Sequence, residues 1–144
     1  MPRSRRSAIV PAPPERVWEV LADPHHMPRW WPELARMEGV EESRFTQVFH
    51  TKKGRPVRVD FDVVRSDPPR ARAWEQELAG TPFERFLHES RIEAVLEPAD
   101  GGTRVTLEHR QRLRGTSKTG GFLLRRATNR KLDAALEGLR EILS

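Results

Sequence analysis

Between residues 37 and 113, apolar and polar side chains alternate in one short run after another. A period of two lets a strand bury one face and expose the other, so these runs predict strands of a half-buried sheet. The clearest run places Val57, Val59, Phe61 and Val63 between charged residues. Turn sequences rich in glycine or proline separate the runs. The predicted strands cover residues 37–42, 44–52, 57–63, 72–78, 86–96 and 105–113.

Residues 119–143 change to helical spacing and carry one continuous apolar stripe. Its members are Leu124, Ala127, Thr128, Leu132, Ala135, Leu139 and Ile142. With a further strand at the N-terminus, the sheet has about six or seven antiparallel strands, and this helix is the element that can cover its inner face. We therefore expect one α+β domain over residues 1–144, with a curved sheet wrapped round the C-terminal helix.

Residues 16–32, RVWEVLADPHHMPRWWP, predict a short amphipathic helix followed by a sharp corner. Pro13-Pro14 favours the helix start, because a missing amide donor costs nothing in the first turn. Asp23-Pro24 ends the helix, since the residue before a proline is pushed out of the helical region. A second short turn then carries Trp30 and Trp31 between prolines. Two indoles at such a corner can line a cavity.

Two segments resemble the START-like (SRPBCC) superfamily, in particular its polyketide cyclase/dehydrase and lipid-transport branch. Residues 13–24, PPERVWEVLADP, and the tryptophan-proline corner are similar to the opening of that family. Residues 101–109, GGTRVTLEH, resemble its last hairpin. The resemblance extends over essentially the whole chain. It implies the helix-grip fold, in which a cavity lies between the sheet and the C-terminal helix, and a function in binding or converting a hydrophobic molecule.

A single helix cannot fill the hollow of a strongly curved sheet, so we expect an apolar cavity with a few polar groups. The inward positions predict its ligand-binding residues as Trp30, Trp31, Phe61, Trp74, Gln76, Phe86, His88, Ser90, Leu107, His109, Leu124 and Thr128. His88 and His109 are the candidates for proton transfer, because histidine titrates near neutral pH. Both could instead lie at the wet rim, and the tryptophans could be core residues. Four carboxylates opposite the apolar positions should face solvent: Asp60, Asp62, Glu75 and Glu77.

The net charge of +5 and a pI of about 10.6 raise the question of nucleic-acid binding. Because the arginines are interleaved with acidic residues along the chain, the pattern does not favour it. The absence of cysteine excludes disulfides and thiolate metal sites, and His25-His26 has no further ligand at metal spacing. We expect neither a metal nor another cofactor. With no apolar signal segment and no membrane-spanning run, we expect a cytoplasmic protein.

Three functions are compatible with the sequence. The first is binding of a hydrophobic or aromatic small molecule, such as a lipid or a polyketide, between the sheet and the helix. The second is a polyketide aromatase/cyclase-like or dehydratase-like enzyme that uses His88 or His109. The third is an accessory protein that binds a quinone or RNA, as some basic members of the superfamily do.

Overall fold

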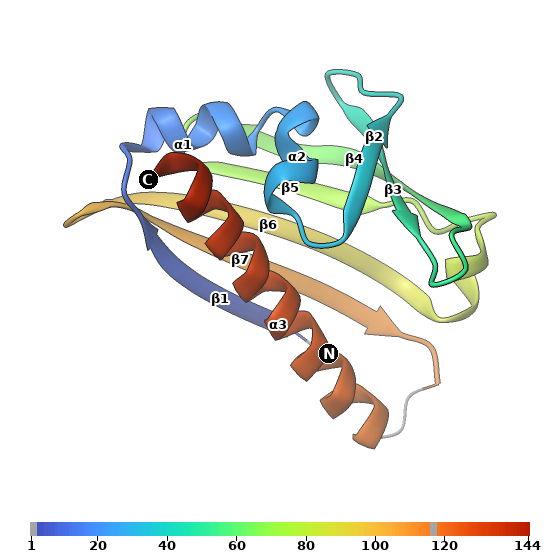
Figure 1. Ribbon diagram of the computed structural model, residues 1–144. Helices are drawn as coiled ribbons and strands as arrows, with labels where there is room; N and C mark the ends of the chain where they lie inside the picture. Colours follow the sequence, from blue (N-terminus) through green and yellow to red (C-terminus); the bar gives the residue numbers. More distant parts are fainter. Residues whose placement is uncertain (1–2, 116–117) are drawn as a thin grey trace.

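A seven-stranded antiparallel sheet curves round a long C-terminal helix in the computed structural model, which describes residues 3–115 and 118–144 (Figure 1). This confirms the expected helix-grip arrangement. The strands are β1 (Arg3–Val10), β2 (Leu34–Glu38), β3 (Arg44–His50), β4 (Pro56–Asp67), β5 (Ala71–Gln76), β6 (Leu87–Ala99) and β7 (Gly102–Leu113). The helices are α1 (Pro14–Leu21), α2 (Met27–Trp30) and α3 (Lys118–Leu143), with single turns of 3-10 helix at η1 (Pro24–His26) and η2 (Pro82–Arg85).

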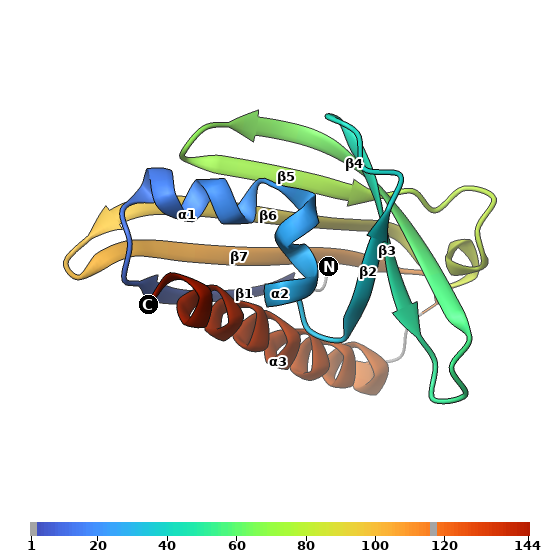
Figure 2. The same ribbon diagram turned by 45° about the horizontal axis from the view of Figure 1, so that its top comes forward.

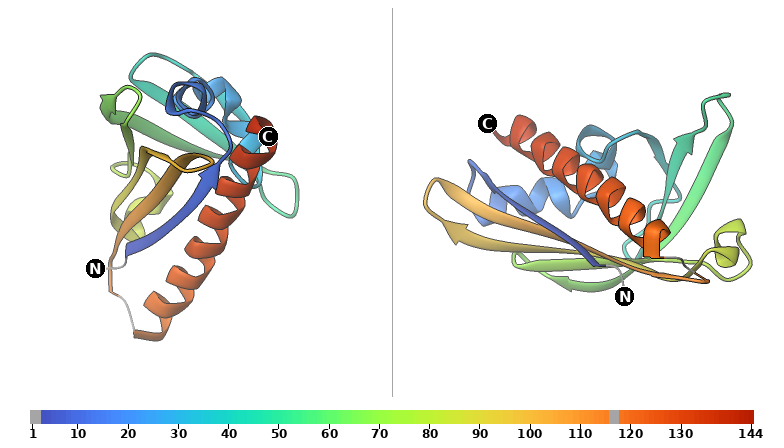
Figure 3. Two further views of the ribbon diagram at one scale, coloured as in Figure 1. Left: turned by 90° about the vertical axis from the view of Figure 1, so that its left-hand side faces the viewer. Right: turned by 90° about the horizontal axis from the view of Figure 1, so that it is seen from below.

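The sheet order β1-β7-β6-β5-β4-β3-β2 brings the first strand against the last, and every neighbouring pair is antiparallel. Strands β2, β3 and the first part of β4 cross the long direction of β6 and β7 steeply, and β4 then bends to run beside β5, which gives the sheet its curvature (Figure 2). All three α-helices lie on its concave side, and α3 runs across that side next to β1 (Figure 3). The concave side of the sheet therefore faces α3.

The corner between α1 and β2 forms for the reasons that the sequence indicates. Pro14 occupies the first turn of α1, and the carboxylate of Asp23 accepts a hydrogen bond from the backbone amide of His25 at 3.0 Å, which starts η1. Trp30 and Trp31 then end up buried. Gly138 of α3 lies directly against the backbone of Trp30. A Cβ atom at residue 138 would approach the Trp30 Cα and carbonyl oxygen to 2.7 Å, so the glycine permits this close helix contact.

The hydrophobic core occupies the end of the molecule near α1 and the C-terminal half of α3. Leu132 and Leu139 of α3 are completely buried there, as are Leu21 of α1 and Trp74 of β5. Phe45 stacks on Phe61, with ring centroids 5.4 Å apart, and extends this core toward β3 and β4. No helix in residues 3–115 and 118–144 is long and apolar enough to cross a bilayer.

The beginning of β6 differs from the prediction. Ser90, Ile92, Ala94 and Leu96 are buried on one face, as the alternation indicates, but Phe86 is 63% exposed and His88 is also exposed. The expected inward positions of Phe86 and His88 were wrong for two local reasons. Phe86 caps η2 before the strand begins, and a register irregularity between Leu87 and Glu89 interrupts the alternation next to β7.

Candidate functional site

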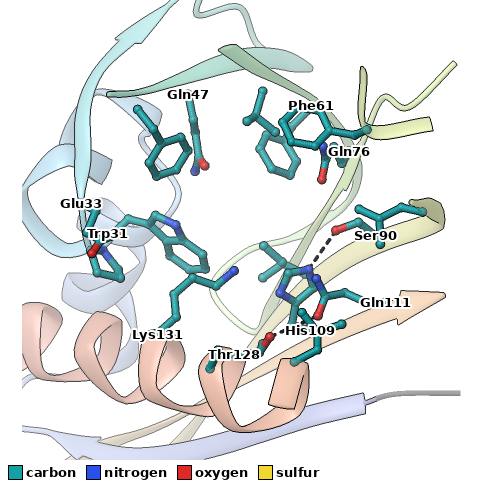
Figure 4. A pocket seen from close by; sticks show the side chains of 18 of the residues that line it. Trp31, Glu33, Gln47, Phe61, Gln76, Ser90, His109, Gln111, Thr128 and Lys131 are labelled. Carbon is teal, nitrogen blue, oxygen red and sulfur yellow. Dashed lines mark hydrogen bonds between the residues drawn. The ribbon is translucent and has the colours of Figure 1, made fainter. Parts of the chain in front are cut away.

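A cavity of about 560 Å³ lies between the concave face of the sheet and the first half of α3 (Figure 4). Its apolar wall comes from strands β3, β4 and β6, from η2, from the corner after α2 and from α3. The main apolar contributors are Trp31, Phe49, Val59, Phe61, Ile92 and Leu124. The α3 side chains that are completely buried in the core, Leu132 and Leu139 among them, lie toward its C-terminus, while Leu124, Ala127, Thr128 and Lys131 face the cavity.

The predicted ligand-binding residues divide into three groups in the structure. Seven of them line the cavity: Trp31, Phe61, Gln76, Ser90, His109, Leu124 and Thr128. Trp30, Trp74 and Leu107 are buried in the core and do not line it. Phe86 and His88 are exposed, as described above, and lie outside the lining. The second aromatic of the corner, Trp31, is therefore the tryptophan that a ligand would meet.

His109 lies on β7 with its ring almost completely buried at the cavity wall. Its Nε2 atom is 2.8 Å from the hydroxyl oxygen of Ser90 on the neighbouring strand, and its Nδ1 atom is buried with no hydrogen-bond partner among the described residues. Burial, and to a smaller extent the nearby charge of Lys131, lower the pKa of His109 from 6.5 to about 3. The imidazole is therefore neutral at neutral pH.

Lys131 is a charged residue of the cavity lining that the sequence interpretation missed. Its side chain leaves α3 toward the cavity, and its Nζ atom lies 5.7 Å from the centre of the Trp31 ring, a cation–π distance (Figure 4). Burial lowers the pKa of Lys131, while the carboxylate of Glu33 at the cavity mouth acts in the opposite direction. Lys131 follows Ala127 by four residues and Thr128 by three. That spacing on the apolar stripe could have identified it.

Three side-chain amides add hydrogen-bonding capacity to the wall. Gln47 of β3 is almost completely buried, and its Nε2 atom donates to the thioether sulfur of Met27 at 3.6 Å. Sulfur is a weak acceptor, so this amide could form a stronger bond with a ligand. Gln111 accepts a hydrogen bond from the hydroxyl of Thr128 at 3.2 Å, which links β7 to α3. Gln76 lines the cavity next to Phe61, its partner across β4 and β5.

Carboxylates are almost absent from the cavity. Asp62 and Glu77 lie on the outer face of the sheet, where both pair with Arg44, at 3.1 and 2.7 Å. This confirms that these two carboxylates face solvent. Within the described residues, Glu33 is the only carboxylate of the cavity lining, and it is exposed at the mouth. The same part of the chain contains no group of three His, Cys, Asp or Glu side chains arranged to hold a metal ion.

Comparison with known families gives one match over nearly the full length. A family model described as polyketide cyclase/dehydrase and lipid transport matches residues 1–143. No curated protein matches the sequence significantly.

Solved structures share the fold at low sequence identity. The di-domain ARO/CYC BexL from the BE-7585A biosynthetic pathway is 24% identical with a TM-score of 0.78, over 98% of this chain and 46% of that chain. The di-domain ARO/CYC StfQ from the steffimycin biosynthetic pathway is 16% identical with a TM-score of 0.79, over 99% and 50% of the two chains. The chain thus spans about half the length of these two proteins. TTHA0849 from Thermus thermophilus is 24% identical with a TM-score of 0.74, over 97% and 95%.

Proposed function

This chain belongs to the polyketide cyclase/dehydrase and lipid-transport family, and we propose from that premise that it binds a mainly apolar, aromatic or polyketide-like molecule in the cavity between the sheet and α3. The observation that carries the proposal is the cavity itself, with about 560 Å³ of space and the aromatic side chains Trp31, Phe49, Phe61 and Phe83 in its lining. Apolar burial contributes about 25 cal/mol per Å², so such walls supply most of the affinity. The few polar groups on the wall orient the ligand.

The geometry of His109 favours binding over catalysis. A general base works best when its pKa lies near the working pH, and the pKa of His109 is lowered to about 3. Neither ring nitrogen is free to take a proton from a ligand, because Nε2 is held by Ser90 and Nδ1 is covered. His88, the other candidate, is exposed and outside the cavity. A cyclase or dehydratase reaction, the second function that we considered, therefore has no ready proton carrier in either histidine.

The outer face of the sheet offers little support for RNA binding. Three of its arginines form ion pairs with acidic neighbours: Arg44 with Asp62 and Glu77, Arg58 with Glu38, and Arg65 with Glu93. A phosphate backbone would have to displace these carboxylates before it gained the same charge contacts. The cavity is the better candidate site.

A pair of valine variants tests the proposal. Val59 on β4 lines the cavity, whereas Val64 on the same strand is 46% exposed. We expect calorimetry to show one molecule of the neutral probe 2-naphthamide bound per chain. Val59→Trp should weaken binding about tenfold or more by filling the space, and Val64→Trp should change it less than about twofold.

Amide and indole NMR spectra report whether each variant is folded and where the probe binds. The Trp31 indole resonance should move on addition of 2-naphthamide to the wild-type protein. Equal loss of affinity in both variants, or probe-induced shifts confined to residues outside the cavity, would contradict a ligand site between the sheet and α3.

A further inference from the structure

The cavity contains a cation without a matching anion. Among the described residues, no carboxylate lies within 4.0 Å of the Lys131 ammonium group, since none of the ion pairs there includes it. Its nearest partner of known geometry is the face of Trp31. A charge withdrawn from water without a counter-ion is unfavourable, and an opposite charge inside the same cavity removes that cost.

The groups that face Lys131 from other elements compensate its charge only in part, since the Glu33 carboxylate favours the charged form but forms no ion pair with it. His109 of β7 is neutral, and Glu33 after α2 is exposed at the mouth. Arg130, which also contributes to the lining, adds a second positive charge on the exposed side of α3. The interior of the cavity therefore carries a net positive charge whenever Lys131 is protonated.

We propose that the cavity selects ligands that carry one carboxylate on an apolar or aromatic body, and that Lys131 is the residue that binds the carboxylate. One ammonium group matches one negative charge. A phosphate would bring up to two charges and three acceptor oxygens into a wall whose remaining polar groups are mainly neutral amides and hydroxyls. The apolar body then lies against Trp31, Phe49 and Phe61. This inference rests on the proposed ligand site and adds the chemical class of its ligand.

The test compares two probes of nearly the same shape, 2-naphthoate and 2-naphthamide. Calorimetry with the wild-type protein should show the carboxylate bound about 10- to 100-fold more tightly than the amide, as expected for a buried hydrogen bond to a charged group. Lys131→Met removes the charge and keeps much of the side-chain volume. It should abolish the preference while the affinity for 2-naphthamide stays within about threefold.

Two further variants make the result specific to the charge at residue 131. Lys131→Arg restores a cation and should restore a preference for 2-naphthoate over 2-naphthamide of at least about tenfold. Lys53→Met removes a charge from the exposed turn between β3 and β4, and it should retain the wild-type preference. If Lys131→Met is unfolded by circular dichroism, Lys131→Gln removes the same charge with a polar side chain and should lose the preference in the same way.

The outcomes separate this inference from the proposed function. Equal affinity of the wild-type protein for the two probes, or a preference that persists in Lys131→Met, would overturn the role of Lys131 while leaving the ligand site intact. Failure of both probes to bind, or binding that Val59→Trp does not weaken, would overturn the ligand site and this inference together.

Discussion

Acidification should destabilise this protein through His109. The ring is buried beside the Ser90 hydroxyl and near the Lys131 ammonium group, so a proton on it would place two positive charges at one wall. Its pKa is about 3 in the folded protein and close to 6.5 when exposed. Between these values the unfolded chain binds the proton and the folded protein does not. The free energy of unfolding therefore falls as the pH falls through this window.

The size of the effect follows from the two pKa values. Their difference corresponds to at most about 5 kcal/mol, and about 2 kcal/mol of it should be lost between pH 7 and pH 5. By pH 4 the loss should reach about 3 kcal/mol. The whole free energy of unfolding of a typical domain is about 5–15 kcal/mol. A loss of about 3 kcal/mol would therefore remove about a third of the stability of an average domain.

Urea unfolding at several pH values, followed by circular dichroism, measures this dependence. His109→Gln can keep a hydrogen bond to Ser90 but cannot titrate, so its free energy of unfolding should fall about 2 kcal/mol less than that of the wild type between pH 7 and pH 5. His88→Gln changes an exposed ring and should follow the wild-type curve. Parallel pH dependences for wild type and His109→Gln would refute the reasoning, because they would show that His109 is not held neutral by folding.

Two further substitutions test the contacts that position the cavity. Gly138→Ala should lower the free energy of unfolding by about 1–3 kcal/mol in urea titrations, although alanine normally favours a helix, because the new Cβ would meet the Trp30 backbone. A stability equal to or above the wild type would show that α2 and α3 do not pack this closely. Trp31→Leu should weaken 2-naphthamide binding about tenfold in calorimetry by removing an aromatic wall, and unchanged affinity would show that this indole does not contact the probe.

The fold could be predicted from the sequence because its signals are local and repeated. The alternation from Val57 to Val63 specifies the buried face of a strand, and the apolar stripe after residue 119 specifies the buried face of a helix. The order of strands and helices along the chain then leaves few ways to pack these faces together. The prediction was wrong at Phe86 and His88, where η2 and the irregularity in β6 shift the side-chain direction. Such interruptions depend on pairing with β7, which no local pattern contains.

The candidate site was harder to predict because burial does not distinguish core from cavity. Trp30, Trp31 and Trp74 are all buried, but only Trp31 lines the cavity, since the others lie under α3 and within the sheet core. Lys131 was missed for a different reason. A lysine beside an apolar stripe usually reaches solvent along the helix surface, and here the adjacent wall of the corner after α2 encloses it instead.

Ligand charge also bears on whether a protein of this geometry can catalyse a reaction. With the cavity unfilled, the charge on Lys131 and the burial of His109 both oppose protonation of the imidazole. A carboxylate bound to Lys131 would cancel the first effect and leave the second, so His109 would become more basic while remaining covered. Proton transfer would additionally require the Ser90 hydrogen bond to break or the ring to turn. Under the proposed function the polar groups of this wall orient a ligand, and catalysis by His109 would need a rearrangement that binding alone does not supply.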